Sequence, residues 1–122
     1  MTARDSKSGQ SINSVPLILD DTLEAISNHR RRFVIRSVDE MAIPVETDDL
    51  ADQLTKIRND PPRKAQDRKR EYVALTQHHL PKLDELGAVA FDKRTKALMP
   101  SPATRKLAML IRLLELLCTG EK

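Results

Sequence analysis

The spacing of apolar residues along the chain is mostly that of amphipathic helices. Leucine, isoleucine and valine recur every three or four residues, which places them on one side of a helix. Within 47–57, for example, Leu50, Leu54 and Ile57 share one face. Helices are therefore predicted over five stretches: 19–26, 28–40, 47–57, 66–86 and 101–119.

Polar residues and glycine mark the expected ends of these helices. Asp21 is a candidate cap for the first helix, and Glu24 three residues later completes the pattern of a capping box. Asn28 is a candidate cap for the second helix and Ser101 for the last. Gly87 fits a left-handed end of the long helix 66–86.

Short apolar segments between the helices are typical of strands. The segment 42–45 ("AIPV") is too short for a helix, and Pro44 lacks an N–H, so a strand here must lie at an edge. The segments 88–91 ("AVAF") and 96–99 ("KALM") are joined by "DKRT" and predict a hairpin. The sequence therefore predicts a mainly α fold with a small β-hairpin, in the α+β class.

The length of 122 residues fits one domain. Only 2% of the residues are aromatic, so aliphatic side chains must fill the interior. Residues 1–15 are rich in polar residues and are predicted to form a flexible tail. Residues 16–100 are predicted to form the folded domain, followed by the amphipathic helix 101–119.

Several classes of site and location are not expected from the sequence. Cys118 is the single cysteine, which excludes an internal disulfide and a cysteine-based zinc finger. No stretch approaches the roughly 20 apolar residues that span a bilayer, and no signal peptide is evident. We therefore expect a cytoplasmic protein without a membrane partner. No phosphate-binding glycine loop or nucleophile motif is present, so no enzyme, cofactor or small-molecule ligand is predicted.

The clustering of basic residues carries more information than the net charge of +3. Cations concentrate before and in the first part of the helix 66–86 and again at the predicted hairpin. An α-helix fits the major groove of DNA, where arginine and glutamine bind guanine and adenine. The candidate DNA-binding residues are Arg63, Lys64, Arg68, Lys69, Arg70, Thr76, Gln77, His78, Lys93, Arg94 and Lys96.

The order of these elements resembles a winged helix-turn-helix. The stretch "HHLPKLDELGAV" resembles the ArsR-type motif in which the DNA-reading helix leads into the wing, through His79, Leu80, Leu83, Gly87 and Val89. The chain is more similar still to a winged-helix family common in haloarchaea, with its "RRRxVI", "DLADQL" and "HLPKLDELGxV" segments. This resemblance implies a DNA-binding fold. The thiol metal ligands of ArsR-type sensors are missing, so metal sensing is not implied.

The two adjacent histidines and the proline of the long helix have different predicted roles. At about 100° per residue, His79 faces the core while His78 projects to the side, so the two cannot share a metal. His79 is predicted to donate a hydrogen bond to a backbone carbonyl, and no metal site is expected. Pro81 is predicted to lie on the outer face and to bend the helix.

The last helix is apolar over more than half of its circumference, whereas packing on one body needs a narrower stripe. This excess predicts a homodimer through the C-terminal helix, with packing inside one chain as the alternative. The predicted interface residues are Leu107, Leu110, Ile111, Leu114 and Leu117.

The leading hypothesis is therefore a homodimeric winged-helix transcription regulator that binds double-stranded DNA sequence-specifically. The alternative is a protein-protein interaction module with a winged-helix fold that no longer binds DNA. The basic long helix and hairpin favour the first.

Overall fold

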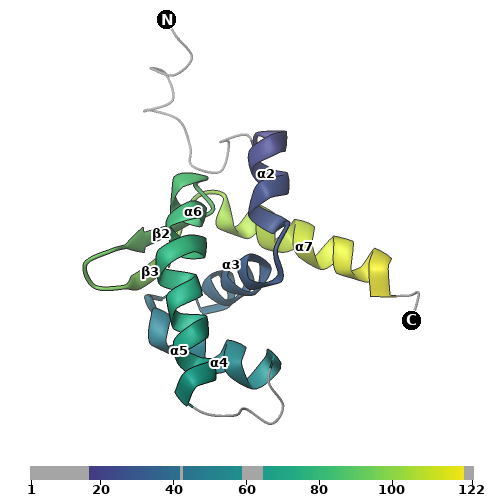
Figure 1. Cartoon of the computed structure of the whole chain (residues 1–122). Coiled ribbons are helices and arrows are strands. Elements are labelled where there is room, and N and C mark those ends of the chain that lie inside the picture. The colour runs from purple at the N-terminus through teal and green to yellow at the C-terminus, as the bar shows by residue number, and fades with distance from the viewer. Residues whose placement is uncertain (1–16, 42, 59–64, 120–122) are drawn as a thin grey trace, which may run out of the picture.

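The computed structural model describes residues 17–41, 43–58 and 65–119, so the predicted tail 1–15 lies outside the described residues. The helices are α2 (Leu19–Ile26), α3 (His29–Met41), α4 (Thr47–Arg58), α5 (Ala65–Ala74), the π-helical turn η2 (Leu75–His79), α6 (Leu80–Glu85) and α7 (Thr104–Thr119). The strands are β1 (Val45–Glu46), β2 (Val89–Asp92) and β3 (Ala97–Pro100). This mainly helical chain with a small antiparallel sheet confirms the predicted α+β class (Figure 1).

The sheet has the order β1-β3-β2. Strands β2 and β3 form the predicted hairpin, with Phe91 opposite Leu98, and Val45 of β1 pairs with Leu98 from the other side. The predicted edge position of the "AIPV" segment is therefore confirmed. Pro44 directly precedes β1, where its missing N–H interrupts no ladder.

The predicted helix 66–86 is confirmed as a continuous helix from Ala65 to Glu85, made of α5, η2 and α6 (Figure 1). Its π turn was not predicted. The N–H of Leu80 bonds to the carbonyl of Leu75, five residues earlier. The extra residue in this turn rotates the residues after it by about 100° relative to an uninterrupted α-helix. Pro81 is consequently half-buried, and its predicted place on the outer face is wrong.

Some helix ends match the predicted caps, and others do not. Asn28 caps α3 by accepting the N–H of Arg30 at 2.8 Å, and Gly87 has the predicted left-handed conformation with φ of 80°. The predicted cap at Asp21 is wrong. Helix α2 begins at Leu19, because the N–H of Thr22 already bonds to the carbonyl of Ile18.

Ser101 lies in the turn before α7, which begins at Thr104. Its hydroxyl accepts the N–H of Ala103 at 3.3 Å and donates to the carbonyl of Gly87 at 2.6 Å. The same side chain thus ties the start of α7 to the end of the long helix.

Aliphatic side chains form the core, as the low aromatic content predicts. Val34, Ile35 and Val38 of α3 are fully buried, and Leu75 from the long helix and Leu98 from β3 are too. Helix α7 packs along α3 and is tied to it at the surface by two ion pairs. Arg105 Nε lies 3.0 Å from Asp39 Oδ1, and Arg36 Nη1 lies 2.9 Å from Glu115 Oε2. The core therefore holds the long helix and the hairpin in fixed positions.

Candidate nucleic-acid interface

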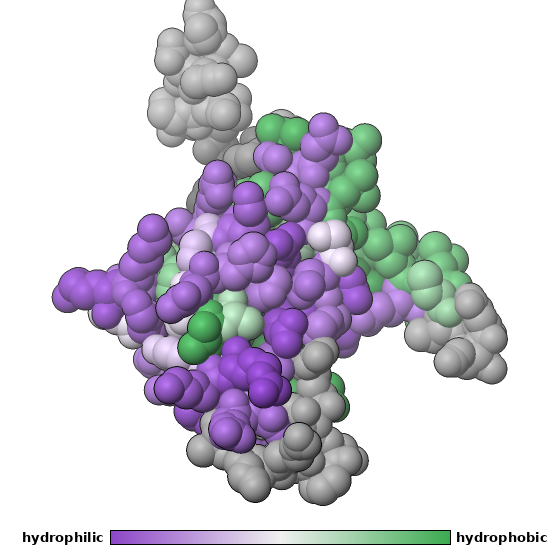
Figure 2. Space-filling model, in the orientation of Figure 1, coloured by the Kyte–Doolittle hydropathy of each residue, from purple (hydrophilic) through white to green (hydrophobic). Residues whose placement is uncertain are grey.

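The outer side of the long helix carries four of the candidate DNA-binding residues. Lys69, Arg70, Gln77 and His78 are all exposed, and Val73 between them is 38% exposed. Figure 2, in the orientation of Figure 1, shows a largely hydrophilic surface over this helix and the hairpin. All four of these candidate residues are therefore accessible on the exposed part of the long helix.

Thr76 differs from these neighbours, because its side chain turns back onto the helix. The residue is half-buried, and its hydroxyl donates to the carbonyl of Tyr72 at 2.9 Å. A hydroxyl held in this way is occupied within its own helix. Thr76 therefore contributes less to the exposed part of the long helix than the sequence pattern predicts.

Arg68 is tied to α4. Its guanidinium lies 3.1 Å from Asp48 and 3.5 Å from Asp52. The side chain is 42% exposed, so this pair of contacts is at the surface. Arg68 neutralises carboxylates of α4 that would otherwise repel a phosphate beside the long helix.

Arg70 remains largely open despite an ion pair. Its guanidinium lies 3.4 Å from the carboxylate of Asp67, and its side chain is 70% exposed. Lys69 has no ion pair within residues 17–41, 43–58 and 65–119. The predicted sites Arg63 and Lys64 lie outside the described residues.

The hairpin tip is shaped by Asp92. Its carboxylate accepts the backbone N–H of Arg94 at 2.8 Å and that of Thr95 at 3.3 Å, and these bonds lower the pKa of Asp92. Lys93 and Arg94 are exposed at this tip. The turn therefore holds two cations outward at the edge of the sheet.

Lys96 is positioned differently from the other two hairpin cations. It is half-buried, adopts the left-handed conformation with φ of 64°, and donates from Nζ to the carbonyl of Lys93 at 2.6 Å. Its own carbonyl accepts both the N–H and the hydroxyl of Thr47. Lys96 thus closes the turn and links the hairpin to α4.

Two arginines of α3, whose roles were not predicted, hold the long helix in place. Arg30 Nε donates to Glu71 Oε1 at 2.7 Å, and its Nη2 donates to Oε2 at 3.2 Å. Both carboxylate oxygens of Glu71 are thus bound by one planar guanidinium, and this carboxylate is 3% exposed. The "RRR" run alone does not indicate this role, because the carboxylate that Arg30 binds, Glu71, is 41 residues away in sequence.

The second anchor is a buried contact between Arg31 and His79. Arg31 Nε donates to His79 Nδ1 at 3.3 Å, while Arg31 Nη1 donates to the carbonyl of Glu24 at 2.7 Å. The predicted inward position of His79 and lateral position of His78 are confirmed. The predicted bond from His79 to a backbone carbonyl is not the contact formed at Nδ1, where His79 accepts from Arg31.

Burial is the largest cause that lowers the pKa of His79, from 6.5 to about 4, and the positive charge of Arg31 adds to it. His79 is therefore neutral at pH 7. Because Nδ1 accepts a hydrogen bond, the proton of the neutral ring lies on Nε2. A neutral acceptor at this position matches the guanidinium that faces it.

The acidic end of the long helix also has a structural role. Asp84 accepts the backbone N–H of Phe91 at 3.1 Å, which joins the helix to the first strand of the hairpin. The angle between the helix and the hairpin is therefore supported by a direct side-chain contact.

The predicted dimer residues on α7 divide into two groups. Leu107 and Ile111 are buried inside the monomer, at 2% and 0% exposure, so their assignment to a dimer interface is wrong. They complete the core against α2 and α3. Leu110 is half-buried against that core, whereas Leu114 and Leu117 are exposed.

Metal-binding clusters and membrane spans are both missing from the described part of the chain. No group of three or more histidine, cysteine, aspartate or glutamate side chains suited to a metal ion occurs among the residues with described positions. Within those same residues, no helix has the length and apolar character needed to cross a membrane.

Comparisons with known proteins identify a family but no function. No curated protein and no solved structure matches the chain significantly. Residues 23–99, from α2 to β3, match a family described as a domain of unknown function, DUF7344. Because the match covers more than half of the 122 residues, the chain belongs to this family.

Proposed function

We propose that the protein binds double-stranded DNA sequence-specifically, as a homodimeric winged-helix transcription regulator in the cytoplasm. The observation that carries this proposal is the exposed part of the long helix. Lys69, Arg70, Gln77 and His78 are accessible there, next to a hairpin whose tip holds Lys93 and Arg94 outward.

The order and pairing of the elements support a winged-helix arrangement. Helices α3 and α4 precede the long helix, and β2 and β3 follow it as an antiparallel hairpin, the wing. The short strand β1, between α3 and α4, pairs with the far strand of that hairpin. In helix-turn-helix proteins the second helix of the motif enters the major groove, and here the long helix corresponds to it.

The side-chain types on the exposed part of the long helix suit a DNA duplex. Arg70 and Gln77 are able to make two hydrogen bonds each to guanine and to adenine. Lys69 and the cations at the hairpin tip suit phosphate contacts, which add affinity and salt dependence but little sequence information. We therefore assign base contacts to the helix and backbone contacts to Lys69 and the wing.

The anchors on the opposite side support the same proposal. A helix that reads bases must keep a fixed orientation, because hydrogen bonds to base edges depend on direction. Arg30 fixes Glu71 in α5, and Arg31 fixes His79 in the π turn. Glu71 precedes Gln77 in the sequence and His79 follows it. The helix around Gln77 is therefore anchored to α3 on both sides of this residue.

Fluorescence anisotropy with labelled duplexes tests the proposal. A pool of mixed-sequence duplexes, selected by repeated binding and then sequenced, should yield a common motif. Affinity for the selected duplex should fall steeply between about 50 and 200 mM salt. Arg70→Ala should weaken binding by about 1–3 kcal/mol and relax the preference at one base position. The double variant Lys93→Ala/Arg94→Ala should reduce the salt slope by about 2 without changing the motif.

Arg105→Ala is the matched control, because Arg105 is 72% exposed and pairs with an aspartate, as Arg70 does at 70% exposure. It lies on α7, outside the proposed interface, and its loss should leave affinity unchanged. If the wild-type chain binds no duplex at low salt, or if Arg70→Ala and Arg105→Ala behave alike, the DNA proposal is wrong. The alternative of a protein-protein interaction module would then take its place.

A further inference from the structure

The outer faces of α2 and α7 expose large apolar side chains. Figure 2 shows hydrophobic residues gathered over these two helices, in contrast to the hydrophilic surface of the long helix and hairpin. Contiguous exposed apolar patches often mark sites of protein-protein interaction. The exposed side chains of this α2–α7 face are Ile18, Leu19, Leu23, Met109, Leu113, Leu116 and Leu117.

The inner side of helix α7 packs against the core of the monomer. Leu107 and Ile111 complete the core, whereas Leu116 and Leu117 in the last turns are 70% and 69% exposed. In Figure 1 the C-terminal half of α7 projects away from the rest of the chain. Within the described part of the chain, Leu116 and Leu117 are therefore largely uncovered.

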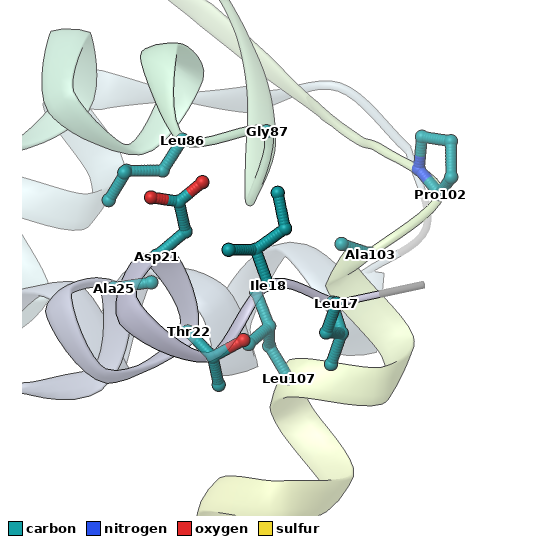
Figure 3. Close-up of a pocket in the computed structure, with 10 residues that line it drawn as sticks. All are labelled: Leu17, Ile18, Asp21, Thr22, Ala25, Leu86, Gly87, Pro102, Ala103 and Leu107. Carbon is teal, nitrogen blue, oxygen red and sulfur yellow. The ribbon is translucent and has the colours of Figure 1, made fainter. Parts of the chain in front are cut away.

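A hollow of about 300 Å³ lies between α2, the end of the long helix and the start of α7 (Figure 3). Its walls are mainly apolar and include Ile18, Ala25, Leu86 and Leu107. The carboxylate of Asp21 lies among these side chains in Figure 3. The hollow thus combines room for an apolar side chain with a nearby negative charge.

The two helices of this face carry opposite charges. Helix α2 contains Asp20, Asp21 and Glu24 and no basic residue. On α7, Arg105 and Glu115 are both paired with residues of α3, whereas the exposed Arg112 has no ion pair within the described ranges. Arg112 and Leu116 are four residues apart, so they lie on the same side of α7. One side of α7 therefore exposes Arg112 and Leu116. The α2 side of the same face exposes carboxylates and the apolar hollow.

We infer that the α2–α7 face binds a second copy of this chain about a two-fold axis. In this arrangement α7 of each copy crosses α2 of the other. Leu116 enters the partner copy's hollow, and Arg112 faces the partner copy's Asp20 and Asp21. A two-fold axis makes each of these contacts twice, as in other interfaces where the same patch occurs on both subunits.

The acidic α2 and the basic side of α7 belong to the same chain. Each copy therefore carries both of the surfaces that a two-fold contact requires. The inference deepens the proposed function and rests on it for the role of the dimer, which is to present two long helices to half-sites about one DNA turn apart. It replaces the sequence-based interface on α7 alone with one that includes α2 and omits the buried Leu107 and Ile111.

Light scattering and sedimentation of the full chain test the apolar part of the inference. The wild-type chain should have the mass of a dimer at micromolar concentration. Leu116→Gln should raise the dissociation constant about 10- to 100-fold, because each dimer buries this side chain twice. Ile43→Gln is the matched control, since Ile43 is 53% exposed before β1 and lines a hollow that includes no residue of α2 or α7, and it should leave the dimer intact. A wild-type chain that is monomeric at these concentrations overturns the inference.

Charge reversal tests the arrangement itself. Arg112→Glu alone, and Asp20→Lys with Asp21→Lys, should each weaken the dimer about 10-fold or more, because like charges then face one another. The triple combination should regain most of the lost affinity. If it does not, the arrangement is wrong even where a dimer forms. Circular dichroism that matches the wild type should establish that every variant is folded.

DNA measurements separate this inference from the proposed function. A folded monomeric variant should still bind a duplex with one half-site, but more weakly to the full site than the wild type. A monomeric wild-type chain that binds DNA removes the dimer and leaves the DNA proposal intact. A charge-dependent dimer that binds no DNA supports the interface and removes the DNA proposal.

Discussion

Two sets of cations lie on opposite sides of the long helix, and their surroundings differ. Behind the helix, Arg30 and Arg31 of α3 contact Glu71 and His79 at distances of 2.7 and 3.3 Å. In front, the side chain of Arg70 is 70% exposed. The same type of side chain is therefore an internal anchor on one side and an available charge on the other.

A basic cluster in a sequence therefore does not have a single role. Desolvating a guanidinium is costly unless hydrogen bonds and charges compensate, so a buried arginine is held by its partners. An exposed arginine keeps its water and is free to exchange it for a phosphate or a base. The difference predicts opposite responses to mutation, in stability behind the helix and in DNA binding in front of it.

The largest effect on stability is expected for Arg30→Ala. This change removes the guanidinium from a carboxylate that is 3% exposed. The free energy of unfolding should fall by about 3 kcal/mol, the lower end of the range for breaking a buried pair, because Arg30 itself is 17% exposed. Urea unfolding followed by circular dichroism measures the change. Arg70→Ala should alter the same free energy by less than about 0.5 kcal/mol. Equal losses for both variants would show that Arg30 is not a stabilising anchor.

The next largest effect is a pH dependence from His79. Its pKa is about 4 in the folded chain, against 6.5 for a histidine in water, so the unfolded state binds more protons between these values. Stability from this residue is fully present above pH 6.5 and is lost as the pH falls towards 4. The loss should reach up to about 3 kcal/mol. Urea titrations across this range should show a smaller acid loss for His79→Gln, which retains an acceptor for Arg31.

His78→Gln is the control for this prediction, because His78 is adjacent but exposed. It should retain the acid loss of the wild type. If the two variants have the same pH profile, the buried contact with Arg31 is not the source of the effect.

Periodicity and turn chemistry were sufficient to predict the helical elements and the hairpin. The long helix, for example, was expected over 66–86 and extends from Ala65 to Glu85. The π turn could not be predicted in this way. Its residue His79 contacts Arg31, which is 48 residues away in sequence, and local periodicity does not contain that contact. A helical wheel assumes a constant rotation per residue and therefore misplaced Pro81.

The sequence was sufficient to predict which types of residue form the candidate site. It did not show which of these side chains are paired within the chain and which are exposed. Arg68 was grouped with its basic neighbours, yet its partners Asp48 and Asp52 come from another helix. Likewise, the continuous apolar surface of α7 did not show that Leu107 belongs to the core and Leu117 to the surface. Both distinctions depend on which elements pack together, and local sequence patterns do not contain that information.

The adjacent residues Arg68 and Lys69 should show the same difference with smaller effects. Arg68→Ala removes surface ion pairs with α4, so the free energy of unfolding should fall by about 1 kcal/mol or less. Its effect on the salt slope of DNA binding should be slight. Lys69→Ala should leave stability unchanged but reduce the salt slope by about 1. Urea unfolding and anisotropy titrations on both variants measure these effects, and a larger slope change for Arg68 would reverse the assignment.

The smallest effect is expected at the hairpin, where Lys96 and Lys93 repeat the comparison within one turn. The ammonium of Lys96 donates to the carbonyl of Lys93, and its backbone is left-handed, a conformation that asparagine tolerates well. Lys96→Asn should therefore change stability by less than about 0.5 kcal/mol and leave the salt slope of DNA binding nearly unchanged. Lys93→Asn should reduce that slope by about 1, because the exposed ammonium is lost. Anisotropy titrations at several salt concentrations distinguish the two. Equal slopes for both variants would mean that the internal hydrogen bond of Lys96 does not withhold its charge from DNA.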